Sequence, residues 1–94
     1  MSDDALRPTL ARRARLRWDE ARGQHVVVVP EGVLLLTEEG AEILSLVDGR
    51  RSLGEVIEAL CAAHPEAPRD VIAADLRDYL GRLVERGYVT LGAP

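Results

Sequence analysis

The apolar pattern is densest between residues 26 and 36, where two apolar runs, 26–29 and 33–36, flank the turn Pro30-Glu31-Gly32. β-Branched residues around a turn that contains Pro and Gly are typical of a β-hairpin. Neither run alternates with polar residues, so Val33 and Leu35 cover one face of the second strand while Leu34 and Leu36 cover the other. An antiparallel sheet usually leaves one face to water. The hairpin therefore predicts helices on one face and a further partner on the other.

An earlier strand is predicted just before the hairpin. From Arg13 to Trp18, arginines alternate with apolar residues, which is the period-two pattern of a strand with one buried face. Consecutive strands usually pair with their neighbours, so the three strands form an antiparallel meander. In that order the strand at 25–29 is central and the strand at 33–36 is an edge.

Three helices follow, at residues 38–47, 53–63 and 69–86. Thr37 suits the N-cap of the first helix, and Ser52 with Glu55 is a capping-box sequence before the second. Gly87 is expected to end the third helix, and residues 88–91 are a short strand or an extended tail. The predicted fold class is α+β, a three-stranded antiparallel meander followed by three helices, which is similar to a winged helix-turn-helix.

The length and composition fit one domain. Of the 94 residues, 47% are hydrophobic, enough for a single core. We expect a flexible N-terminal tail at residues 1–7 and one domain at residues 8–91. No apolar run approaches the roughly 20 residues that span a bilayer, and the N-terminus lacks the order of a signal peptide. We therefore expect a cytoplasmic protein without membrane contact.

Residue patterns that carry catalysis or hold metals are not recognisable. Cys61 is the only cysteine, and together with His25 and His64 it offers no metal-ligand spacing. No nucleophile with a base and no glycine-rich phosphate loop is found. We therefore expect no catalytic residue, no metal and no cofactor, and a binding module rather than an enzyme.

Nucleic-acid binding is the alternative that the element order raises, because DNA-reading helix-turn-helix proteins place a recognition helix in the major groove. In residues 69–86, however, four arginines are matched by four acidic residues, and the whole chain has a net charge of −4. Binding to phosphates requires clustered cations. We therefore expect no nucleic-acid partner and keep a winged-helix DNA-binding regulator only as the alternative.

The edge strand at 33–36 favours a different mode of binding. Its free N–H and C=O groups can pair with an added strand, and side-chain pockets beside it can give selectivity. The third helix would form the second wall of a groove. The same edge can pair with a second copy of the chain, so a monomer and a weak homodimer are both compatible with the sequence.

Several short motifs follow one another in a fixed order: Pro8-Thr9-Leu10, Arg15-Leu16-Arg17-Trp18-Asp19, Pro30-Glu31-Gly32, Leu36-Thr37, Ala41-Glu42-Ile43-Leu44, and Asp48-Gly49 followed by the Ser52 capping box. Together they resemble the PqqD family, the peptide chaperones of pyrroloquinoline quinone biosynthesis and the prototype of precursor-peptide recognition domains. The resemblance extends over residues 8–91. Thr37 stands where Asn is more usual, and either residue caps a helix.

The resemblance implies that a ribosomally made precursor peptide adds a strand beside residues 33–36 and lies against the third helix. It also implies delivery of this peptide to a radical S-adenosylmethionine enzyme that cross-links a Glu and a Tyr in the peptide. The cofactor and the chemistry would then belong to that partner enzyme.

The candidate peptide-binding residues come from the edge strand and from one face of the third helix: Val33, Leu34, Leu35, Leu36, Asp75, Leu76, Tyr79 and Leu83. Leu76 and Leu83 fit the core at least as well as a groove wall. Arg13, Arg15 and Arg17 are secondary candidates for docking the enzyme, and a solvated strand face is the alternative explanation for them.

Overall fold

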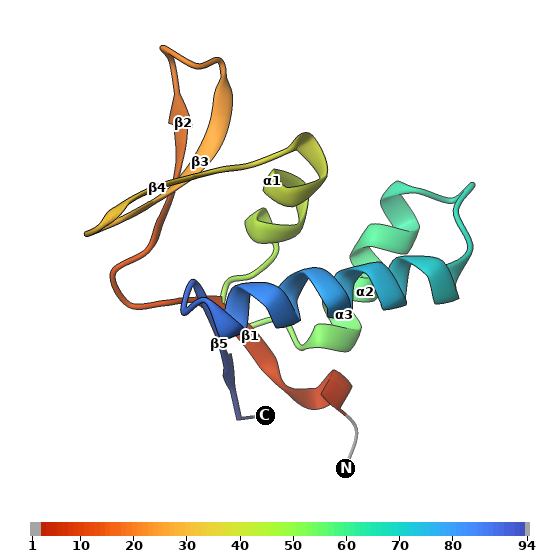
Figure 1. Cartoon of the computed structure of the whole chain (residues 1–94). Coiled ribbons are helices and arrows are strands. Elements are labelled where there is room, and N and C mark those ends of the chain that lie inside the picture. Colours follow the sequence, from red (N-terminus) through yellow and green to blue (C-terminus); the bar gives the residue numbers. More distant parts are fainter. Residues whose placement is uncertain (1–2, 94) are drawn as a thin grey trace.

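The computed structural model describes residues 3–93 and contains two small sheets and three α-helices (Figure 1). In chain order the elements are the 3-10 helix η1 (Asp3–Ala5), β1 (Arg7–Leu10), β2 (Arg15–Asp19), β3 (Gln24–Val29), β4 (Gly32–Leu35), α1 (Glu38–Ser45), α2 (Leu53–Ala63), α3 (Arg69–Glu85) and β5 (Val89–Gly92).

The predicted meander is confirmed as an antiparallel sheet with the order β2-β3-β4. Val27 pairs with Leu16 on one side and with Leu34 on the other, so β3 is central and β4 is an edge. The start of β2 differs from the expectation. The strand begins at Arg15 rather than Arg13, because the N–H of Ala14 donates to the carbonyl of Ala11 (2.9 Å) and closes a turn there.

A second sheet was not expected. β1 pairs antiparallel with β5, so residues 7–10 and 89–92 lie side by side (Figure 1). The segment 88–91, predicted as a short strand or an extended tail, therefore belongs largely to a strand, β5. The expected tail at residues 1–7 also differs from the structure. Residues 3–5 form η1 and Arg7 belongs to β1, while residues 1 and 2 lie outside the described residues.

Two contacts explain why the segment before residue 8 is ordered. The carboxylate of Asp4 pairs with the guanidinium of Arg77 on α3 (2.5 Å). The carbonyl of Leu6 accepts the N–H of Leu53, the first residue of α2 (2.8 Å). Such long-range partners leave no local periodicity in the sequence.

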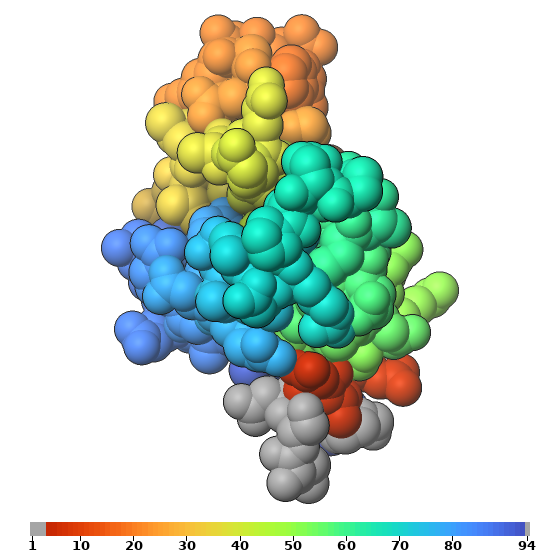
Figure 2. All heavy atoms as spheres, turned by 90° about the vertical axis from the view of Figure 1, so that its right-hand side faces the viewer, coloured from red at the N-terminus to blue at the C-terminus, as the bar shows by residue number. Residues whose placement is uncertain are grey.

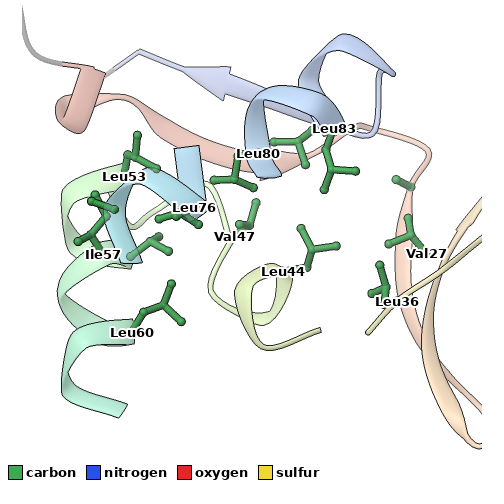
Figure 3. Packing of buried hydrophobic residues seen from close by; sticks show 14 residues of the cluster. Val27, Leu36, Leu44, Val47, Leu53, Ile57, Leu60, Leu76, Leu80 and Leu83 are labelled. Carbon is green, nitrogen blue, oxygen red and sulfur yellow. The ribbon is translucent and has the colours of Figure 1, made fainter. Parts of the chain in front are cut away.

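The core is aliphatic and lies mainly among the three helices, with the inner face of the larger sheet at one end of it (Figure 3). Val27 and Leu36 contribute from the sheet side, and Leu44 from α1 lies between them and Leu80 and Leu83 of α3 (Figure 3). Cys61 is half-buried and packs against this cluster, as expected for a small hydrophobic residue. Within residues 3–93, the helices are too short or too polar to cross a membrane.

Candidate functional site

The free edge of β4 presents backbone hydrogen-bonding groups at alternate residues. In the pairing of β3 with β4, the N–H of Leu36 donates to the carbonyl of His25 (3.1 Å). Antiparallel strands exchange hydrogen bonds at every second residue, so Leu34 also directs its N–H and C=O toward β3. Val33 and Leu35 then direct theirs to the free edge. An extended peptide beside β4 would bond to these two residues.

A groove lies between this edge and the C-terminal half of α3. We call it the edge groove, and its lining residues are Leu34, Leu35, Leu36, Thr37, Tyr79, Arg82, Leu83 and Arg86. The helical members recur at spacings of three and four residues, so they share one face of α3. The groove thus combines free strand edge, apolar side chains and two guanidinium groups.

Tyr79 forms one end of the edge groove. Its side chain is half-buried, and burial raises the pKa of its phenol, so the ring stays neutral at ordinary pH. The hydroxyl lies over Gly40, the buried third residue of α1. Thr37 caps this helix by accepting the N–H of Gly40 on its side-chain oxygen (3.0 Å). The start of α1 and the middle of α3 are therefore fixed against each other at Tyr79.

The outer face of the larger sheet is apolar as well. Val26 with Leu35 and Val28 with Val33 are non-hydrogen-bonded cross-strand pairs, whose side chains lie close together on the face away from the helices. Val33 and Leu35 are 48% and 53% exposed, respectively. Arg15 and Arg17 flank this patch from β2, opposite Val28 and Val26. We call these six residues the outer sheet face.

The structure brings together most of the candidate peptide-binding residues, but not all. Leu34, Leu35, Leu36, Tyr79 and Leu83 line the edge groove. The side chain of Val33 lies on the outer sheet face, so only its backbone N–H and C=O face the free edge. Asp75 and Leu76 line a separate hollow on the other side of Tyr79. Leu76 and Leu83 are almost fully buried in the core, so only part of each side chain borders the solvent.

Sequence reasoning missed Thr37, Arg82 and Arg86 as groove residues. The two arginines follow Tyr79 by three and seven positions, so helical periodicity from Tyr79 would have found them. Thr37 was assigned only as a cap, and that role is confirmed. The arginines proposed for docking are also separated, since Arg13 lies in the turn before β2 while Arg15 and Arg17 lie in the strand.

The charges of α3 do not form a phosphate-binding surface. Arg69 pairs with Glu58, Arg77 with Asp4 and Arg82 with Asp78, so these guanidinium groups already have carboxylate partners. This arrangement does not favour the DNA-binding alternative. Among the described residues, no three His, Cys, Asp or Glu side chains are grouped so as to hold a metal ion.

Comparisons with known proteins agree on one family. The family profile described as "Coenzyme PQQ synthesis protein D (PqqD)" matches residues 24–89. A protein of Bradyrhizobium diazoefficiens, described as a PqqA binding protein, is 40% identical over 93% of this chain and 84% of its own length. A PqqA binding protein of Kluyvera intermedia is 31% identical over 100% of this chain and 99% of its own length.

A solved structure has the same fold along nearly the whole chain. It is the solution NMR structure of the PqqD truncation of Methylobacterium extorquens PqqCD, described as a functional, stand-alone recognition element for ribosomally synthesised and post-translationally modified peptides. The TM-score is 0.76 with 31% sequence identity, and the match covers 96% of this chain and 94% of the other.

Proposed function

The chain belongs to the PqqD family, and we propose that it binds the ribosomally made precursor peptide of pyrroloquinoline quinone by strand addition at β4. The observation that carries this proposal is the pair of free backbone positions, Val33 and Leu35, beside the edge groove. Relatives named for binding PqqA and a relative described as a peptide recognition element support it.

In the proposed complex, the peptide is an extended strand between β4 and α3. Backbone bonds to Val33 and Leu35 give affinity that depends little on sequence, while the side chains of the peptide select by what they meet on α3. Alternate peptide side chains would face Tyr79 and Leu83, and Arg86, which makes no ion pair with another described residue, stands where an acidic side chain would be favoured.

A proline at position 33 tests the strand addition directly. The N–H of Val33 points away from β3, so Val33→Pro removes one donor for the peptide while the β3–β4 pairing keeps its bonds. We expect Val33→Pro to lower peptide affinity by about tenfold or more, and Val33→Ala to keep it within about threefold, as judged by isothermal titration. Circular dichroism of both variants monitors folding.

Amide hydrogen exchange gives a second readout that needs no substitution. On addition of the peptide, the amides of Val33 and Leu35 should become protected, whereas Leu34, already bonded to β3, should change little. Equal affinity of Val33→Pro and wild type, or no protection at 33 and 35, would contradict strand addition. Because a second copy competes for the same edge, both experiments use a concentration at which light scattering reports a monomer.

The bound peptide is proposed to pass to a radical S-adenosylmethionine enzyme, which cross-links a Glu and a Tyr in it and supplies the cofactor and the catalysis. In this scheme the chain itself is a cytoplasmic binding protein. The outer sheet face is the proposed docking surface, because it adjoins the groove at Leu35 and combines Arg15 and Arg17 with the exposed side chains of the same face. Arg15 is held by the carbonyls of Arg12 and Ala14 (2.9 and 3.0 Å), so Arg17 is the freer cation.

Charge reversal tests this docking surface. Arg15→Glu with Arg17→Glu should weaken binding of the peptide-loaded chain to the enzyme by about tenfold and leave peptide affinity unchanged. The matched control reverses two exposed arginines elsewhere, Arg7→Glu with Arg50→Glu. Adding Arg13→Glu to the variant with both strand arginines reversed measures how much the turn before β2 contributes to enzyme binding. If the strand variant and the control bind the enzyme equally, the outer sheet face is not the docking surface.

A further inference from the structure

A second hollow lies on the same face of α3, on the N-terminal side of Tyr79. We call it the acidic hollow. Its floor is apolar and consists of Ile43 from α1, Leu60 from α2, and Ile72 and Leu76 from α3. Figure 2 views this side of the molecule, where α1 (yellow) lies above the start of α3 and the connector that precedes it (cyan and teal). The hollow is open to solvent and has no role in the function proposed above.

Carboxylates surround this apolar floor. Glu39 and Glu42 stand on α1, Glu66 on the connector and Asp75 on α3. The one basic side chain in the lining is His64, which Glu42 already holds by a 2.8 Å contact to Nε2. Within residues 3–93, no arginine or histidine forms an ion pair with Glu39 or Asp75. An apolar floor with a negative rim complements a large apolar side chain next to an Arg or Lys.

The acidic hollow continues the edge groove. Asp75, Tyr79 and Leu83 are spaced by four residues, so they share one face of α3, with Asp75 in the acidic hollow and Tyr79 and Leu83 in the edge groove. From Asp75 to Leu83 the helix rises about 12 Å, a span that an extended peptide covers in roughly four residues. Strand β4 also runs toward α1. A peptide that extends past Thr37 therefore arrives at Glu39.

On the basis of the function proposed above, we propose that the acidic hollow is a second subsite for the same peptide. It takes a large apolar side chain with an adjacent Arg or Lys, about four residues from the side chain that enters the edge groove. Arg86, which makes no ion pair with another described residue, gives the edge groove the opposite charge. The two depressions together select a peptide with one acidic and one basic part and fix the direction in which it lies along α3.

The test uses Glu39→Lys with Asp75→Lys. Both residues are exposed and make no ion pair with another described residue, so the fold should be retained. The control is Glu20→Lys with Glu85→Lys, which changes the net charge equally at two exposed positions outside both depressions. The probes are the PqqA peptide for which the relatives are named and the same peptide with each Arg and Lys replaced by Gln.

We expect the Glu39→Lys, Asp75→Lys variant to bind the unaltered peptide at least about tenfold more weakly than wild type, with the control within about twofold. Against the Gln-substituted peptide, the variant and wild type should be equal. The proposal is overturned if the variant binds the unaltered peptide as tightly as wild type, or if the control loses as much affinity. It is also overturned if only binding of the partner enzyme falls. Failure of wild type to bind any peptide would instead contradict the proposed function.

Discussion

The hydroxyl of Tyr79 lies so close to Gly40 that a Cβ atom at position 40 would stand 2.5 Å from the phenolic oxygen and 3.3 Å from Cζ. Real side-chain contacts are not that short, so glycine is required for α1 and α3 to meet in this way. Tyr79 in turn lines the edge groove. A single glycine in α1 thus sets the position of a side chain on which the edge groove depends.

Gly40→Ala should displace the Tyr79 ring and weaken peptide binding. The clash is with the far end of a flexible side chain, so the ring can swing away and the fold should survive. We expect about a three- to tenfold loss of affinity in isothermal titration. Because the shortest contact is to the hydroxyl, Tyr79→Phe added to Gly40→Ala should recover part of the loss. An additive double-mutant cycle would show that the two residues are not coupled.

Gly81→Ala is the matched glycine substitution on α3 and should stabilise the protein. A Cβ atom at position 81 meets nothing within 4 Å. In an exposed helix interior, alanine is favoured over glycine by about 0.5–1 kcal/mol. Urea unfolding followed by the fluorescence of Trp18 should show this gain, with peptide affinity unchanged. A loss of stability would mean that this turn of α3 is less regular than the structure indicates.

Thr37 caps α1, so its replacement should reveal how much the cap contributes to the stability of the fold. Thr37→Ala removes the acceptor for the Gly40 N–H and should cost about 1 kcal/mol. Thr37→Asn keeps an acceptor and should be nearly neutral. Both free energies come from urea unfolding. A cost for Asn equal to that for Ala would indicate that the β-branched side chain, rather than the hydrogen bond, matters at this position.

The Glu42–His64 contact should make the link between α1 and the end of α2 dependent on pH. The hydrogen bond that the ring of His64 donates to the carboxylate of Glu42 is the main cause that raises the pKa of His64 above its ordinary value of 6.5. Because the pKa of His64 is higher in the folded state than in the unfolded state, the contact stabilises the protein fully below the pKa of the unfolded state. This stabilisation is lost as the pH rises through the pKa of the folded state. The difference in thermal stability between wild type and His64→Gln should therefore be largest at about pH 5.5 and smallest above about pH 8. These pH values lie about one unit below and one to two units above the usual pKa of histidine.

Ring NMR signals provide the direct check on this pair. In wild type, His64 should titrate at a higher pH than a free histidine, and Glu42→Gln should move its pKa back toward 6.5. Glu66 lies 3.7 Å from the other ring nitrogen and should retain a smaller effect. If Glu42→Gln leaves the titration of His64 unchanged, the contact does not form in solution.

The sequence was informative where the determinants of structure are local. The hairpin around Pro30-Glu31-Gly32, the Thr37 cap and the Ser52–Glu55 capping box are set within a few residues, and each was predicted with bounds close to those observed. The edge position of β4 followed from the order of neighbouring strands. These features place one wall of the candidate site.

The parts that were not predicted depend on residues far apart in the chain. Pairing of Thr9 with Thr90, and of Asp4 with Arg77, joins segments whose own patterns are too short to indicate a strand or a contact. The presence of two depressions along one face of α3 was likewise not predicted. Periodicity places Asp75 and Leu83 on one face, but it does not show that they line two different depressions.

The pairing of β1 with β5 has a consequence for how this recognition unit can be joined to other proteins. Leu91 of β5 lies beside the flank of α3 that carries Arg77 and Gly81, opposite to the flank of Tyr79 and Leu83, and β1 pairs with β5 there. The two ends of the fold therefore leave the surface together and away from the groove (Figure 1). A domain or an affinity tag fused at either end would leave the entrance for the peptide unobstructed, so the same unit can serve alone or as one part of a fusion.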